Sequence, residues 1–237
     1  MLHRKIARLL QWLKLPIGVL TLLYTPSAAW LCWILTQHLA NDLPYLAYFL
    51  GGLLGYGLVW VLWLRTSSVS FLSTLEHELT HAIFALLTFN KVTGFKATWR
   101  RGGHMDYEGT ANWLIHLSPY FFPTLNVLLL IPMAFAPTEW RAWLFLGQGL
   151  ALGYHLASTY SETHLNQKDL QLAGWWFCVC FLPFANLMAY ALLLTGLAHG
   201  LTGMTELLAT LPATPLKPDP MLVWLYQHAY AFSQQWL

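Results

Sequence analysis

Six apolar runs, each long enough to cross a lipid bilayer, dominate this sequence. A transmembrane helix needs about 20 predominantly apolar residues. The sequence therefore predicts an all-α polytopic membrane protein with about six transmembrane helices. The runs lie at about residues 16–39, 44–64, 69–89, 113–136, 140–160 and 170–198.

The low charge content indicates a membrane protein and limits the kinds of partner that the chain can bind. Of the 237 residues, 57% are hydrophobic and only 9% are charged, whereas soluble domains carry about 25% charged residues. The net charge is only +2 and no basic block suits a nucleic acid. We therefore expect the lipid bilayer and membrane-embedded proteins as partners, and no nucleic acid. The sequence leaves the oligomeric state and the membrane orientation open.

The third apolar run contains a His-Glu-x-x-His motif formed by His77, Glu78 and His81. On a helix, residues four apart share one face, so both imidazoles can reach one metal ion. Zinc takes imidazole nitrogen readily, and a catalytic site keeps one position open for water. Glu78 is then placed to act as general base on that zinc-bound water. Composition alone would produce the motif in roughly one such sequence in a hundred.

A catalytic zinc site of this kind needs a third protein ligand. With six spans, one side of the bundle collects several residues that could supply it. From the residues alone the choice among them stays open, and the strongest alternatives to Asp169 are Glu162, His155 and His164. The full set on this side is His104, His116, His155, Glu162, His164 and Asp169.

Residues 91–109 differ from the apolar runs because two β-prone stretches flank a glycine turn there. This pattern predicts a β-hairpin at the membrane edge. Such a strand either accepts an extended substrate by strand addition or only connects two helices. We expect three parts in the chain. These are N-terminal helices with a basic amphipathic lead-in (1–68), a catalytic membrane core (69–198), and a proline-rich linker with an amphipathic tail (199–237).

Four segments together resemble the site-2 protease family of intramembrane zinc metalloproteases. They are the motif at His77–Ala82, the hairpin around Gly102–His104, the proline-bearing stretch Leu117–Pro123 and the acidic stretch Gln167–Gly174. The resemblance implies a three-helix catalytic core and a zinc ion held by two histidines and one aspartate. Carried onto this sequence, those ligands are His77, His81 and Asp169. The chain departs from the family pattern where Thr80 replaces a common glycine and where Leu170 follows Asp169.

The resemblance also implies an activity and a location. We expect a zinc metalloendopeptidase that hydrolyses peptide bonds of membrane-embedded proteins, with Glu78 as general base. The alternative is a non-hydrolytic metal-binding membrane protein, either an inactive protease relative or a metal transporter. Similarity of the acidic stretch to bacterial members suggests a multi-pass protein of the bacterial cytoplasmic membrane.

Overall fold

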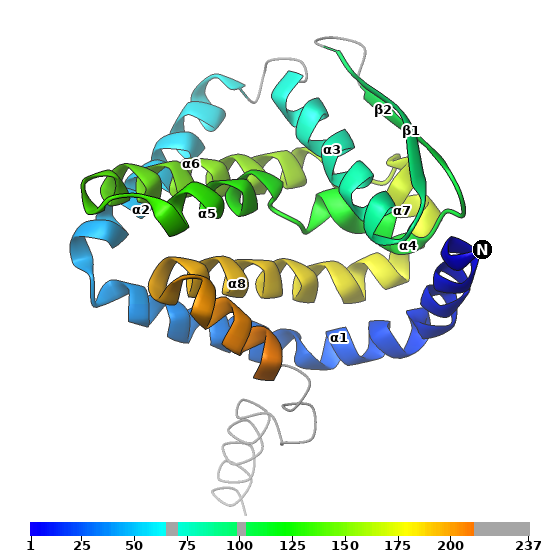
Figure 1. The fold of residues 1–237 in the computed structure, drawn as a ribbon, viewed down its shortest axis with the longest axis horizontal. Coiled ribbons are helices and arrows are strands. Elements are labelled where there is room, and N and C mark those ends of the chain that lie inside the picture. The colour runs from blue at the N-terminus through cyan, green and yellow to red at the C-terminus, as the bar shows by residue number, and fades with distance from the viewer. Residues whose placement is uncertain (65–70, 99–102, 211–237) are drawn as a thin grey trace, which may run out of the picture.

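The computed structural model describes residues 1–64, 71–98 and 103–210, most of which are helical (Figure 1). One small antiparallel sheet follows the third helix. The prediction of a mainly helical chain with a hairpin after the motif helix is therefore confirmed. The elements are α1 (Leu2–Ala40), α2 (Leu43–Leu62), α3 (Phe71–Leu87), β1 (Lys91–Ala97), β2 (Gly103–Glu108), α4 (Trp113–Leu117), η2 (Ser118–Tyr120), α5 (Thr124–Phe135), α6 (Thr138–Glu162), α7 (Lys168–Ala173) and α8 (Trp175–Thr210).

Fewer helices than expected are long and apolar enough to be candidate membrane spans in the described part of the chain. Among the described residues, α1, α2 and α8 are long and apolar enough to cross a membrane. A fourth span arises only if Trp113–Tyr120 and Thr124–Phe135, which are bent by 72°, count as one. The six spans expected from the sequence are thus not confirmed. The third run gives α3, which has 17 residues and carries two glutamates and two histidines, and the fifth gives α6, which contains buried polar side chains.

The fourth apolar run, 113–136, is broken at two prolines. Pro119 lies in η2, and Pro123 is the N-cap residue of α5. Proline has no N–H to donate, so a helix does not pass through this segment unbroken. The carbonyl of Tyr120 accepts a hydrogen bond from Asn186 Nδ2 on α8 at 2.9 Å, which satisfies one backbone group left free by the break. The two prolines thus separate the short helix α4 from α5.

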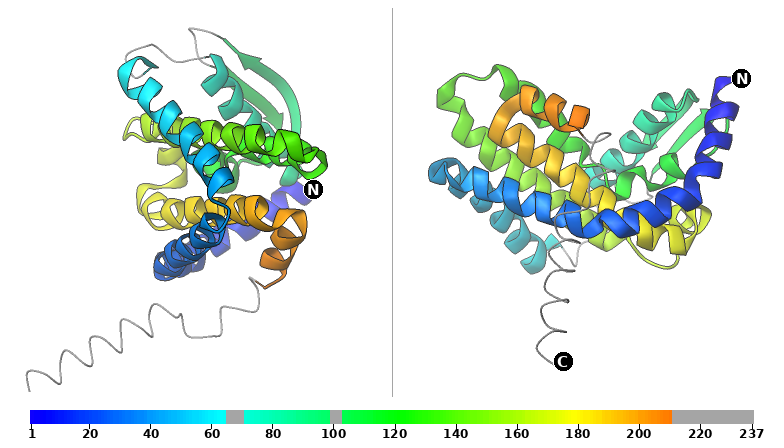
Figure 2. Two further views of the ribbon diagram at one scale, coloured as in Figure 1. Left: turned by 90° about the vertical axis from the view of Figure 1, so that its left-hand side faces the viewer. Right: turned by 90° about the horizontal axis from the view of Figure 1, so that it is seen from below.

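The first helix is longer than expected. It runs from Leu2 to Ala40 through Pro16 and Pro26, whereas the sequence predicted a lead-in before a span that begins at residue 16. Its N-terminal part turns up beside α4 (Figures 1 and 2). There the indole Nε1 of Trp113 donates to the carbonyl of Leu10 at 2.8 Å. The lead-in is therefore packed onto the core of the protein.

Helices α2 and α6 pack closely through glycine. A β-carbon at Gly52 would lie 2.2 Å from the carbonyl oxygen of Leu146, and one at Gly149 would lie 1.9 Å from that of Phe49. Only glycine permits such a backbone approach. Gly55 of α2 lies in open space by contrast, because nothing lies within 4 Å of a β-carbon there.

The strands β1 and β2 form the hairpin expected within 91–109, and they pack against α3 (Figure 1). The register pairs Lys91 with Glu108 and Ala97 with Gly103, with an irregularity between Val92 and Gly94. The expected turn around Gly102 lies outside the described residues. The described strands place the start of β2 directly over the motif helix.

The last helix lies between α1 and α5 and extends past the expected end of the sixth span (Figure 1). It is interrupted at Gly200, whose φ of 66° is a conformation that glycine adopts readily. The proline-rich linker and the amphipathic tail, from residue 211 onward, lie outside the described residues. The division of the chain at 68 and 198 stays a prediction.

Candidate metal centre

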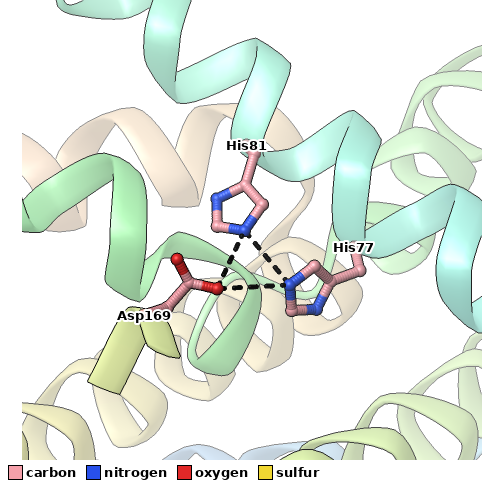
Figure 3. A group of neighbouring side chains, drawn as sticks. All are labelled: His77, His81 and Asp169. Atoms are coloured by element: carbon pink, nitrogen blue, oxygen red, sulfur yellow. Dashed lines mark hydrogen bonds and ion pairs between the residues drawn. The ribbon is translucent and has the colours of Figure 1, made fainter. Parts of the chain in front are cut away.

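Two histidines of α3 bring ring nitrogens to one point (Figure 3). His77 and His81 lie one helical turn apart and share a face, as their spacing predicted. Their Nε2 atoms are 3.1 Å apart. His81 is buried and His77 is half-buried. This pair therefore forms two corners of a small, partly enclosed site.

Asp169 of α7 provides the third corner (Figure 3). Its Oδ2 atom lies 3.5 Å from His81 Nε2 and 3.8 Å from His77 Nε2. Its other oxygen, Oδ1, is 3.0 Å from Nδ1 of His116 on α4. Burial acts to raise the pKa of Asp169, but the hydrogen bond with His116 lowers it, and the pKa lies below its usual range. The carboxylate is therefore ionised.

The far side of each imidazole is held by an acceptor. Nδ1 of His81 lies 2.8 Å from the carbonyl oxygen of Ile115, which can only accept, so this Nδ1 carries the proton. Nδ1 of His77 lies 2.6 Å from Oε2 of Glu162, an oxygen that can accept a hydrogen bond from the imidazole N–H. In the neutral imidazoles, the lone pairs then lie on the two Nε2 atoms. Metal-ligating histidines are commonly oriented by such acceptors on the second ring nitrogen.

This arrangement fits a metal ion. Three atoms that can each give a lone pair to a metal ion, from His77, His81 and Asp169, lie within 4.8 Å of one another. A tetrahedral ion with bonds of about 2.0–2.1 Å has ligand atoms about 3.3–3.4 Å apart. The observed separations of 3.1, 3.5 and 3.8 Å bracket that value. The three residues are thus a possible metal site of the described chain.

Glu78 lies next to this centre, in the wall of a cleft of about 450 Å³. His77 and Gly103 line the same cleft. The hairpin approaches α3 closely here, since a β-carbon at Gly103 would lie 2.7 Å from Cγ of Glu78 and 2.7 Å from Cγ2 of Thr74. Glu78 is half-buried and stands between the metal-site histidines and the first residue of β2.

Residues 53–213, more than half of the chain, match the family model described as Peptidase M50B-like. This chain belongs to the Peptidase M50B-like family. It is therefore a member of the site-2 protease family. Comparisons with curated proteins and with solved structures gave no match. Membership suggests a metallopeptidase, and together with the apolar helices it suggests a membrane protein.

The other residues expected near this M50B-like centre have different positions. Glu162 forms a hydrogen bond with Nδ1 of His77, on the side of the ring away from the metal site, and is not one of the three possible metal ligands. His155 is buried on α6 beside a small cavity shared with Glu162. His164 is exposed at the rim of the cleft. His104, on the hairpin, is 3.5 Å from Asp106. Among these candidates, only Asp169 meets both motif histidines.

Two buried polar residues of the motif helix were not anticipated. Glu76 accepts a hydrogen bond at 3.0 Å from the backbone N–H of Leu125, in the first turn of α5. Thr80 hydrogen-bonds to Thr124, also at the start of α5, and donates to the carbonyl of Glu76 at 2.7 Å. The hydroxyl at position 80 thus ties α3 to the helix that follows the proline break. Only the polarity of Glu76 inside an apolar run signalled such a role.

Proposed function

We propose that this protein is an intramembrane zinc endopeptidase that hydrolyses peptide bonds of membrane-embedded proteins. The observation that carries the proposal is the convergence of His77, His81 and Asp169 beside Glu78. Family membership supports the same reaction class. The donor set of two imidazoles and one carboxylate, with one position left for water, is typical of catalytic zinc sites.

In this proposal His77, His81 and Asp169 hold the zinc ion. The ion, when bound, polarises the scissile carbonyl and lowers the pKa of a water molecule at its open position. Glu162 and the carbonyl of Ile115 keep the two imidazoles oriented. His116 fixes the free oxygen of Asp169 and leaves Oδ2 directed at the histidines.

Glu78 carries the proton transfers. It takes a proton from the attacking water as the water oxygen bonds to the scissile carbonyl carbon. It then gives this proton to the leaving amine nitrogen as the carbon–nitrogen bond breaks. The position of Glu78 in the cleft wall, next to His77, supports this role. Because Glu78 is outside the set of converging atoms, it is free to act as a base.

The cleft supplies both an apolar wall and polar groups for a peptide. Tyr56, Trp60 and Tyr154 form aromatic parts of its lining, and Ser158 and Ser161 of α6 add hydroxyls. Hydroxyls in the cleft allow water to reach a site within an apolar bundle. The hairpin lies against the same cleft at Gly103, so an extended substrate bound along β2 would pass Glu78. Strand addition of this kind uses the backbone groups of an edge strand.

The competing function is metal binding without hydrolysis, as in an inactive relative or a transporter. Metal binding alone requires His77, His81 and Asp169. It does not require a general base, which is the role proposed for Glu78. The presence of Glu78 in the cleft wall beside His77 therefore favours the hydrolytic function.

A trapping experiment tests the proposal. Membrane proteins captured by the detergent-purified Glu78→Gln variant are identified and then incubated with zinc-loaded wild type. We expect wild type to cleave the captured proteins and the variant to retain zinc but cleave nothing, because Glu78 does not hold the ion. Equal cleavage by the variant would overturn the assigned role of Glu78. Intact clients with both proteins would favour metal binding without hydrolysis.

A further inference from the structure

The N-terminal part of α1 concentrates positive charge. Four of the twelve Lys and Arg residues lie within its first 14 residues, and no Asp or Glu precedes Asp42. Arg4 and Arg8 are exposed and form no ion pair with any other described residue. They are four residues apart and so share a helix face. Their guanidinium groups are therefore available to an anion from outside the described chain.

A hollow of about 480 Å³ lies beside these two arginines. Gln11 continues their side of the helix, and the buried Ala7 leaves room between them. The opposite wall is the segment 110–112, between the hairpin and α4. Arg4, Arg8 and Gln11 thus line a space large enough for a phosphate group. The planar guanidinium fork matches phosphate oxygens in a bidentate manner.

The neighbouring face of the same helix is apolar and exposed. Leu9, Trp12 and Leu13 are 57%, 75% and 39% exposed. A helix with exposed leucine and tryptophan beside basic residues lies in the membrane interface, with its cations at the level of the headgroups. Tryptophan is enriched at that depth. With the helix in that position, the hollow would open at the level of the lipid phosphates.

We propose that this hollow binds the phosphate group of an anionic phospholipid, held by Arg4, Arg8 and Gln11. Each Lys or Arg near an anionic surface contributes about fivefold to affinity. Removal of both arginine charges is then expected to weaken binding by roughly 25-fold. The inference does not depend on the hydrolytic function, because it concerns a surface away from Glu78.

The site also connects to the scaffold of the metal centre. His3 and Thr110, which flank the hollow, are linked by a hydrogen bond of 3.0 Å between Nδ1 and Oγ1. Asn112 caps α4 by accepting from the N–H of Ile115 at 3.2 Å, and the carbonyl of Ile115 orients His81. A bound headgroup thus clamps α1 to the segment that begins α4. We expect anionic lipid to raise the melting temperature as well as to bind.

Native mass spectrometry of the detergent-solubilised full chain measures the binding. Wild type and Arg4→Gln/Arg8→Gln are each titrated with phosphatidylglycerol. The control variant, Arg141→Gln/Lys91→Gln, removes two exposed charges that do not line the hollow. We expect the double variant at the hollow to lose roughly 25-fold in affinity, and the control to change by less than about threefold. Equal affinity for all three proteins would overturn the proposal.

Two further titrations identify the source of the phosphate. Phosphatidylcholine, which has a phosphate but no net charge, is expected to bind more weakly than phosphatidylglycerol. Inorganic phosphate at millimolar concentration is expected to leave bound phosphatidylglycerol in place. Equal binding of the two lipids would refute a preference for anionic headgroups, and displacement by inorganic phosphate would refute a lipid as the ligand. Melting of the double variant, unlike that of wild type, should not respond to phosphatidylglycerol.

Discussion

The hydrogen bond between His77 and Glu162 offers a direct way to test how the centre is held. Its length of 2.6 Å places an acceptor behind the imidazole and fixes the proton on Nδ1. Ser158 donates to the other oxygen of Glu162 at 3.1 Å, so the carboxylate is itself held in place. Replacing Glu162 with alanine removes the acceptor, whereas glutamine keeps an acceptor oxygen and removes the charge. The two variants therefore separate orientation from electrostatics.

The expected magnitude follows from the kind of bond. Hydrogen bonds to charged groups contribute about 1.5–3 kcal/mol, and neutral ones about 0.5–1.5 kcal/mol. Loss of a carboxylate behind a metal-ligating histidine typically costs 10- to 100-fold in metal affinity. We therefore expect Glu162→Ala to bind zinc about 10- to 100-fold more weakly than wild type. The zinc affinity of Glu162→Gln should be at most about tenfold lower than that of wild type, because its amide oxygen still orients His77.

Zinc affinity is measured by competition with a chelator on detergent-purified protein. His164→Ala is the matched control, since His164 lies at the rim of the same cleft and should leave zinc affinity within about twofold. An unchanged affinity in Glu162→Ala would refute the orienting role. Complete loss of zinc, equal to that of His77→Ala, would instead make Glu162 a ligand in its own right.

Two further variants test the hairpin and the Asp169 contact. Gly103→Ala would place a β-carbon 2.7 Å from Cγ of Glu78, so cleavage should fall by about 10- to 100-fold with zinc retained, whereas Gly55→Ala, in open space, should cleave normally. Normal cleavage by Gly103→Ala would show that the hairpin can shift without effect. His116→Ala removes the bond to Oδ1 of Asp169, which should raise the pKa of Asp169 and make zinc dissociate at a higher pH as the solution is acidified. A pH titration of bound zinc identical to that of wild type would contradict this.

The sequence could predict the parts of the site that depend on local geometry. His77 and His81 share a face because any helix places residues four apart on one side. Asp169 was one of six candidates that the expected arrangement of spans collected on one side, and the family resemblance singled it out. In the structure Asp169 belongs to a separate short helix, α7, which ends before Gly174, whose φ is 87°. That break is not visible in hydropathy.

The remaining contacts depend on tertiary placement and could not be read from the sequence. The carbonyl of Ile115 reaches His81 only because the proline break shortens α4. Glu162 was a candidate ligand, and its position behind His77 depends on how α6 packs. The six spans expected from hydropathy were not confirmed, for a related reason. Apolar runs show that a segment is buried, but α3 also carries buried Glu76 and Thr80, which contact protein groups.

The zinc K-edge X-ray absorption spectrum of the purified wild-type protein tests the central claim most directly. We expect about one zinc per chain, with two imidazole nitrogens and a carboxylate oxygen at about 2.0–2.2 Å and no sulfur near 2.3 Å. The imidazole signal should fall by half or vanish in His81→Ala, and zinc should be lost or its shell altered in Asp169→Ala. A sulfur-containing shell, or a wild-type spectrum retained in both variants, would contradict a zinc site formed by His77, His81 and Asp169.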